Sequence, residues 1–392
     1  MQSFTPFLVF CCVLHCVTCE DPEFNLTARQ LILYNGYPEE DHWVTTSDGF
    51  ILGLQRIPHG KHGPSSGPRP VFFLQHALLC SSTTWLTNVA NESLAFLLAD
   101  EGYDVWLGNV RGNTYSRNHT KLSPSQSAFW SWSWDEMALL DLPAMINYVI
   151  EVTNQTEIFY VGHSQGTVMG FAGFSVNQVL ASHIKAFFAL APVAHAGHIK
   201  GLLRVLAVVA PEIEDLLHLF GVKDFLPNTE LTKFIAQYVC VSDIAALCAD
   251  VLFLTCGFDV SHFNETRLPV YLSHTPAGTS VQNVIHFVQE VNSNKFQMYD
   301  YGSPQANADH YSGMTAPPVY NLTDFHVPVY TYQGTNDWLA DSEDVVWLKS
   351  QLSSLQGNKT INGYEHLDFI WATDVATQVY GHIIDEAKKL LQ

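Results

Sequence analysis

A short run of residues near the middle of the chain constrains its fold more than any other feature. Residues 158–161 are Ile-Phe-Tyr-Val, which favour a β-strand, and Gly162-His163-Ser164-Gln165-Gly166 follows them directly. The next apolar residues, 168–174, are small enough for a buried helix. A strand, a sharp turn with serine at its apex and a helix form the context of a nucleophile elbow. The two glycines are needed there because larger side chains would collide with the neighbouring strand and helix.

Apolar runs spaced along the chain predict the sheet to which this strand belongs. A short helix within 24–41 and a hairpin of 42–46 and 50–57, closed by an Asp-Gly turn, come first. Helices are expected at 93–100 and 134–152, and Pro143 should kink the second of them. Strands that alternate with helices indicate an α/β fold with a mostly parallel sheet covered on both faces. The runs that predict buried strands are 71–74, 104–107, 158–161, 184–190 and 327–332.

The alternation of strands and helices stops between about residues 194 and 318. This block is rich in apolar residues at 202–219 and 234–258 and becomes loop-rich near 273–280 and 299–318. Such an insertion predicts a second, mostly helical cap over the carboxyl ends of the strands, where open α/β sheets bind ligands.

Charge and targeting signals restrict the partners and the compartment. The chain has 38 acidic and 18 basic residues among 392, a net charge of −20, which opposes binding to nucleic acid. Residues 1–19 contain an apolar run too short to span a bilayer and indicate a secretory signal peptide. No transmembrane anchor is expected. Seven N-x-[ST] sequons predict N-glycosylation in the secretory pathway, at Asn25, Asn91, Asn118, Asn154, Asn264, Asn321 and Asn358.

Four cysteines remain after the signal segment, and spacing alone leaves all three of their full pairings open. They are Cys80, Cys240, Cys248 and Cys256.

An acid and a histidine should follow Ser164 in the order Ser, Asp, His. Asp337 lies just past the strand predicted at 327–332, and His366 lies on a loop before the terminal helix. Asp341 and Asp344 are alternative candidates for the acid, but they lie where a helix of about 342–355 begins. We therefore interpret them as residues that cap this helix and interact favourably with its dipole. Other histidines are less suitable: His310 and His326 precede the acid, and His382 lies within a helix.

Two backbone N–H groups are expected to bind the developing oxyanion. They belong to Leu78, on the loop after the strand at 71–74, and to Gln165. His195 and His198 have a spacing that zinc ligands can use, but no acidic or cysteine partner lies nearby in the sequence. We therefore expect no metal and no cofactor.

These motifs together make the chain resemble the acid lipase family, the family of the gastric and lysosomal acid lipases. The resemblance implies an α/β-hydrolase core with an inserted, mainly helical cap and lid. The expected parts are a signal peptide (1–19), the core (20–194 and 319–392) and the cap and lid (195–318). The resemblance is carried by 35–38, 47–52, 102–109, 111–113, 162–166, 276–280, 337–341 and 366–371.

The resemblance also implies a site and an activity. The triad would be Ser164, Asp337 and His366, with Leu78 and Gln165 as oxyanion donors. A lid disulfide would join Cys240 to Cys248. The reaction would be hydrolysis of triacylglycerols or sterol esters at a lipid interface, often at acid pH, by a secreted or lysosomal monomer.

One departure bears on the activity. Ala77 stands in the oxyanion loop where the family usually has glycine, so the loop would be strained if that position needs a positive φ. A catalytically silent lipid-binding or storage protein is therefore an alternative. A soluble carboxylesterase that acts on dispersed short esters is another.

Overall fold

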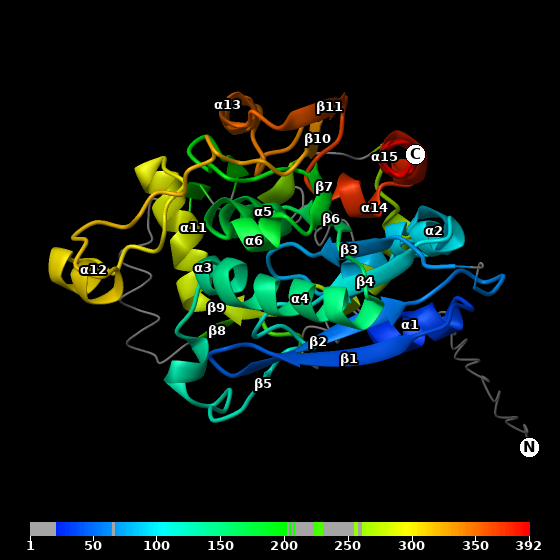
Figure 1. Ribbon diagram of the computed structural model, residues 1–392, viewed down its shortest axis with the longest axis horizontal. Helices are drawn as coiled ribbons and strands as arrows, with labels where there is room; N and C mark the ends of the chain where they lie inside the picture. Colours follow the sequence, from blue (N-terminus) through cyan, green and yellow to red (C-terminus); the bar gives the residue numbers. More distant parts are fainter. Residues whose placement is uncertain are drawn as a thin grey trace, which may run out of the picture.

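The computed structural model describes most of the chain and is shown in Figure 1. The described residues are 21–64, 67–201, 204–205, 207, 223–229, 255–257 and 261–392. The predicted signal segment 1–19, Cys240 and Cys248 lie outside these ranges, as do most of 202–219 and 234–258. In the part of the chain that is described, no helix is long and apolar enough to cross a membrane.

A nine-stranded sheet forms the centre of the molecule, with β1 at one edge and β11 at the other (Figure 1). The strand order is β1-β2-β4-β3-β6-β7-β10-β11, and the short β5 pairs with β2. Pairing is antiparallel from β1 to β4 and parallel from β4 to β11. The strands are β1 (Glu40–Thr45), β2 (Phe50–Ile57), β3 (Val71–Gln75), β4 (Asp104–Gly108), β5 (Asn118–His119), β6 (Ile158–His163), β7 (Ile184–Leu190), β10 (Val329–Gly334) and β11 (Leu355–Ile361).

Helices cover this sheet and bury its central strands. Every residue of β3, β4 and β6 is buried, as their continuous apolar runs require. Helix α5 packs on β6, α2 packs on β4, and α13 packs on β10. The core helices are α1 (Ala28–Tyr34), α2 (Leu94–Asp100), α3 (Trp134–Glu136), α4 (Leu142–Thr153), α5 (Gln165–Val176), α6 (Gln178–Ala181), α13 (Ser342–Gln351), α14 (Asp368–Trp371) and α15 (Gly381–Leu390).

The helix expected at 134–152 is interrupted, as the proline within it predicts. A π-helical turn, Met137–Asp141, separates α3 from α4, and Pro143 lies at the first positions of α4. Proline has no backbone N–H to donate, so it fits where a helix restarts. A second π-helical turn, Ala376–Tyr380, precedes α15.

The described residues of the predicted insertion at 195–318 include α-helices and a small sheet. The sheet pairs β8 (Asp224–Phe225) with β9 (Thr279–Ser280) in antiparallel fashion. Figure 1 shows α11 and α12 together at one side of the central sheet. The helices are α10 (Leu268–His274), α11 (Val281–Ser293) and α12 (Pro304–His310).

Candidate active site

The backbone at Ser164 makes the sharp turn that the sequence predicts. Ser164 links β6 to α5 with φ 53° and ψ −116°, a backbone conformation that residues other than glycine rarely adopt. A Cβ atom on Gly162 would lie 2.6 Å from the carbonyl oxygen of Gly166. A Cβ atom on Gly166 would lie 2.4 Å from the carbonyl oxygen of Gln75. Both glycines are therefore required by close approach of backbone, and the loop after β3 lies directly against the turn.

The structure brings Ser164, His366 and Asp337 together in a chain of hydrogen bonds. The Oγ of Ser164 lies 2.7 Å from Nε2 of His366. On the other side of the ring, Nδ1 lies 3.0 Å from each carboxylate oxygen of Asp337. A carboxylate only accepts hydrogen bonds, so Nδ1 carries the proton and Nε2 is free to accept the proton of the serine hydroxyl.

Asp337 is held in place by its own backbone as well as by the histidine. It lies three residues after the end of β10, and its side chain is buried. Its Oδ1 accepts hydrogen bonds from the N–H groups of Leu339 at 2.9 Å and Ala340 at 2.8 Å. These bonds stabilise the charged carboxylate and fix its direction toward His366.

The two competing acids have other roles. Asp341 caps α13, since its side chain accepts a hydrogen bond from the N–H of Glu343 at 3.0 Å. Asp344, in the first turn of α13, contacts His195 and His198. The interpretation as a helix cap is therefore confirmed for Asp341. The main contacts of Asp344 are with the two histidines, and these were not predicted.

His163 also lies at the candidate site, although no catalytic or positioning role was predicted for it from the sequence. It lies next to Ser164 and is fully buried. Its Nε2–H donates to the main-chain carbonyl of His366 at 2.9 Å. Burial lowers the pKa of His163 to about 3, so the ring stays neutral and keeps a single N–H for this bond.

A second buried histidine, His76, orients the loop that carries the expected oxyanion donor. Its Nδ1–H donates to the carbonyl oxygen of Ala77 at 2.8 Å. Its Nε2 lies 3.3 Å from the N–H of Val110 and 3.1 Å from Nδ2 of Asn113, and accepts from both. Burial lowers the pKa of His76 to about 4, which keeps Nε2 an acceptor. Val110 and Asn113 lie in the loop after β4, which therefore supports the loop after β3.

The alanine in this loop does not take the strained conformation that its replacement of glycine suggested. Ala77 is buried and is absent from the described residues with positive φ, whereas Leu79 has φ 60°. Leu78 lies between them and is partly exposed. Gln165 is the first residue of α5 and is buried, with its side chain bonded to Asn283 at 2.8 Å.

The remaining predicted residues lie as follows. Cys80 and Cys256 are buried and are not joined in a disulfide. Six sequon asparagines are exposed and Asn264 is half-buried. His310 and His326 are exposed, and His382 is half-exposed on α15 with its Nδ1 2.8 Å from the hydroxyl of Tyr332.

Comparison with known protein families assigns the fold. Residues 70–210 match the model of the alpha/beta hydrolase fold, and residues 28–89 match a partial alpha/beta-hydrolase lipase region. A solved epoxide hydrolase from Vigna radiata superposes with a TM-score of 0.52 at 17% identity, covering 90% of this chain and 98% of that one. The protein thus has the α/β-hydrolase fold, as the sequence predicts.

Comparison with curated proteins assigns the family. Gastric triacylglycerol lipase of Homo sapiens is 49% identical over 365 residues, 93% of this chain and 91% of that protein. Lysosomal acid lipase/cholesteryl ester hydrolase of Homo sapiens is 47% identical over 375 residues, 95% of this chain and 93% of that protein. The chain therefore belongs to the acid lipase family, a family of carboxylic ester hydrolases, as its motifs indicate.

Proposed function

We propose that the protein is a serine lipase that hydrolyses triacylglycerols or sterol esters through an acyl-enzyme on Ser164. The observation that carries this proposal is the 2.7 Å contact between Oγ of Ser164 and Nε2 of His366, with Asp337 on the far side of the ring. The three side chains stand in the arrangement that removes a proton from a serine hydroxyl.

The proposed reaction has two halves. In the first, Oγ of Ser164 bonds to the ester carbonyl carbon while its proton passes to Nε2 of His366. The tetrahedral intermediate then breaks the bond to the alcohol oxygen, which takes the proton back from Nε2. In the second half, water attacks the acyl-enzyme and gives a proton to His366. The fatty acid leaves, and Ser164 regains its hydrogen.

The N–H groups of Leu78 and Gln165 are proposed to stabilise the oxyanion of both intermediates. Gln165 begins α5, so its N–H points out of the helix N-terminus, where negative charge is favoured. The backbone carbonyl of Gln75 lies close to Gly166, so the loop that carries Leu78 and the start of α5 that carries Gln165 are neighbours. One such donor typically contributes about 3 kcal/mol to transition-state stabilisation.

The substrate class is proposed from the insertion and from the relatives. The stretches 202–219 and 234–258 are strongly apolar, which suits a water-insoluble ester. The two relatives described above are named as a triacylglycerol lipase and as an acid lipase and cholesteryl ester hydrolase. We propose that the protein acts as a monomer at an oil–water or lipid-droplet surface.

We further propose that the chain enters the secretory pathway and is N-glycosylated, as a secreted or lysosomal protein. The exposure of six of the seven sequon asparagines supports this, because the transferred glycan is bulky. A signal peptide at 1–19 and a lid disulfide between Cys240 and Cys248 are parts of the same proposal.

Hydrolysis of emulsified triolein and cholesteryl oleate tests the activity directly. We expect turnover by the wild-type protein, and a loss of at least about 10⁴-fold in Ser164→Ala with an unchanged melting temperature. Ser182→Ala, which removes an exposed serine hydroxyl directly after α6, is the matched control and should keep full activity. No turnover of any acylglycerol or sterol ester by the wild type would favour the silent lipid-binding alternative.

A second measurement separates a lipase from a soluble carboxylesterase. Tributyrin hydrolysis is followed as the substrate concentration passes its solubility limit. A lipase gains rate when the emulsion forms, whereas a carboxylesterase saturates on dispersed monomers. A plateau below the solubility limit, without activity on triolein, would favour the carboxylesterase.

A further inference from the structure

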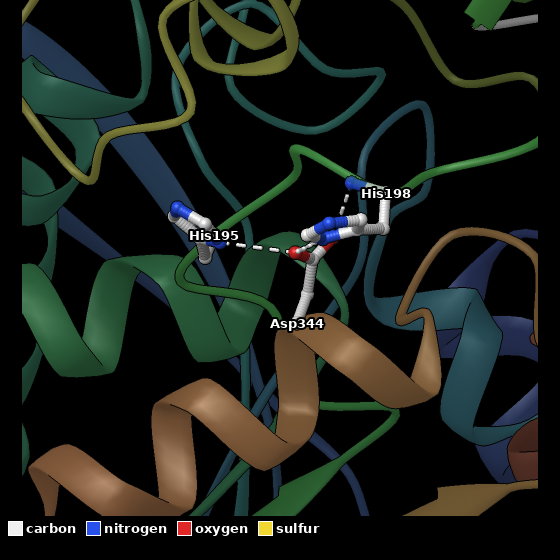
Figure 2. A group of neighbouring side chains, drawn as sticks. All are labelled: His195, His198 and Asp344. Atoms are coloured by element: carbon white, nitrogen blue, oxygen red, sulfur yellow. Dashed lines mark hydrogen bonds and ion pairs between the residues drawn. The ribbon is translucent and has the colours of Figure 1, made fainter.

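A cluster of two histidines and one aspartate lies apart from the triad, between the loop after β7 and the start of α13. Figure 2 shows the carboxylate of Asp344 pointing from α13 toward the imidazoles of His195 and His198. Oδ1 of Asp344 lies 3.0 Å from Nδ1 of His195 and 2.7 Å from Nδ1 of His198. All three potential ligand atoms lie within 4.8 Å of one another. Sequence spacing could not reveal this cluster, because the acid is 146 residues beyond His198.

The carboxylate of Asp344 is fixed before any ligand arrives. Its Oδ2 accepts the backbone N–H of His198 at 2.9 Å, which directs Oδ1 toward both rings. The side chain is only 3% exposed. Lys200, the nearby cation of the same loop, pairs with Asp341 at 2.6 Å and leaves Asp344 to the histidines.

The imidazole of His195 has an acceptor on the nitrogen that faces away from Asp344, because Nε2 lies 2.7 Å from the main-chain carbonyl of Asn294. Metal-bound histidines commonly donate their second N–H to a carbonyl or a carboxylate in this way. Nε2 of His198 lies 3.6 Å from the carboxylate of Glu343, which is the distance of an ion pair and too long for a hydrogen bond. His195 also stacks on Trp347, with 4.4 Å between ring centroids, so its orientation is set on two sides.

The hydrogen bond to Asn294 has a consequence for the other nitrogen of His195. A carbonyl oxygen only accepts, so Nε2 carries the proton, and in the neutral ring Nδ1 presents a lone pair. Nδ1 lies 3.0 Å from Oδ1 of Asp344, the distance of a hydrogen bond in which Nδ1 carries a proton. A cation bound to both atoms would take the place of that proton.

We propose that Nδ1 of His195, Nδ1 of His198 and Oδ1 of Asp344 bind one Zn²⁺ ion, with water in the fourth position. Two imidazoles and a carboxylate are a donor set that zinc accepts, whereas Mg²⁺ and Ca²⁺ prefer oxygen ligands alone. Tetrahedral bonds of about 2.0–2.1 Å place ligand atoms about 3.3 Å apart, so the present separations of 3.0 and 2.7 Å need only a small opening. The side chain of His198 is 45% exposed, which gives the ion and its water a path from solvent.

The loop between the two histidines packs closely against Asn294. A Cβ atom on Gly197 would lie 1.5 Å from Oδ1 of Asn294, so a larger residue there would require the Asn294 side chain to move. The same loop leads from β7 into the insertion, and the N–H of Lys200 donates to the carbonyl of Trp338, next to Asp337. A bound ion would therefore fasten the base of the insertion to the segment that carries the proposed catalytic acid. Because it binds the folded state, it would stabilise that state.

Zinc binding by the full chain, freed of metal by chelation and dialysis, tests the proposal. Calorimetric titration with ZnCl₂ at pH 7.5 should show one equivalent bound and a melting temperature raised by a few degrees. Co²⁺ in place of Zn²⁺ should give the strong visible absorption of a tetrahedral site. A wild-type protein that binds no zinc at micromolar concentrations would overturn the proposal and leave a hydrogen-bonded cluster of the two histidines and Asp344.

Three variants separate this site from adventitious binding, which is a concern in a chain with 18 histidines. His198→Asn keeps a donor at the position of Nδ1 and so keeps the hydrogen bond to Asp344, but it should weaken zinc binding about 100-fold. Glu343→Gln removes a negative charge 3.6 Å from Nε2 of His198 and should weaken binding by a smaller factor, at most about tenfold. The control His326→Ala removes an exposed histidine elsewhere and should bind zinc as the wild type does. Equal affinity in His198→Asn and the wild type would overturn the proposal.

Discussion

The N–H of His163 donates to the main-chain carbonyl of His366 at 2.9 Å, so two hydrogen bonds tie the nucleophile turn to the histidine loop. The other is the bond between Ser164 and the ring of His366. The two loops are 203 residues apart in the chain. The bond from His163 restricts the backbone of the histidine loop and leaves the ring free to exchange a proton with Ser164.

We predict that His163→Leu lowers kcat by about 10- to 100-fold with little change in KM, because small displacements of a reacting group are costly. His163→Gln places an amide N–H near the position of Nε2 and should recover most of the loss. Kinetics on emulsified triolein measure both effects. A purely structural role for His163 would make the two variants equally defective and would lower their melting temperatures alike.

Replacement of the proposed catalytic acid should act through the tautomer of His366. In Asp337→Asn, Oδ1 can still accept from Leu339 and Ala340, so the amide nitrogen faces Nδ1 of His366. An amide N–H directed at Nδ1 favours the tautomer of His366 with its proton on Nε2, and that nitrogen can no longer accept the proton of Ser164. We expect kcat to fall about 10⁴-fold with the fold intact. Asp324→Asn, an exposed control, should be fully active. Retention of more than a tenth of the activity in Asp337→Asn would exclude Asp337 from the triad.

The sequence was most informative where function depends on local pattern and chain order. The strand and helix around Ser164 follow from adjacent residues, and Asp337 follows from its distance to the end of a strand. The parallel strands all end at the same edge of the sheet, so residues placed just after different strands converge there. That geometric rule made the three predicted side chains candidates for one site.

Contacts between distant loops could not be predicted in this way. The sequence shows that His163 is next to Ser164, but not that its ring meets the backbone of His366. It also places His195 and His198 close together, but it does not predict that Asp344 contacts them. The position of Asp344 in the first turn of a helix indicated only an interaction with the helix dipole. These contacts depend on how loops pack over the strand ends, and the spacing of apolar residues along the chain does not predict that packing.

The backbone conformation of Ala77 illustrates a further limit and leads to another prediction. The sequence raised the question of a positive φ at this position, whereas the loop takes its positive φ at Leu79. Alanine is then unstrained, and Ala77→Gly should change kcat on triolein by no more than about threefold. A gain of tenfold or more would mean that Ala77 does strain the oxyanion loop.

Buried acids near α11 should make the stability of the fold depend on pH. Asp135 is buried, with its Oδ2 3.9 Å from Nδ1 of His286, and burial raises its pKa from 3.8 to about 8. Glu290 is fully buried, and burial raises its pKa well above its usual value. Between pH 3.8 and about 8 the folded state holds a proton at Asp135 that the unfolded state has lost. Stability therefore falls as pH rises through this window, by up to about 1.4 kcal/mol per pH unit.

Buried histidines change the stability of the fold with pH in the opposite direction, but only at lower pH. Burial lowers the pKa of His76 to about 4 and the pKa values of His163 and His286 to about 3. Each unfolded histidine binds a proton below about pH 6.5 while the folded one does not, so each reduces stability as pH falls below that value. Above pH 6.5 these three histidines no longer contribute, and the buried acids dominate.

We therefore predict that the melting temperature of the wild-type protein falls between pH 6.5 and pH 8. Asp135→Asn removes the titrating group while its amide keeps one acceptor for the N–H of Tyr299, so its melting temperature should fall less over the same range. Asp324→Asn, which changes an exposed aspartate, should keep the wild-type slope. Thermal unfolding at several pH values, at constant ionic strength, measures all three slopes. Equal slopes for the wild type and Asp135→Asn would show that the proton on this carboxyl group does not control stability.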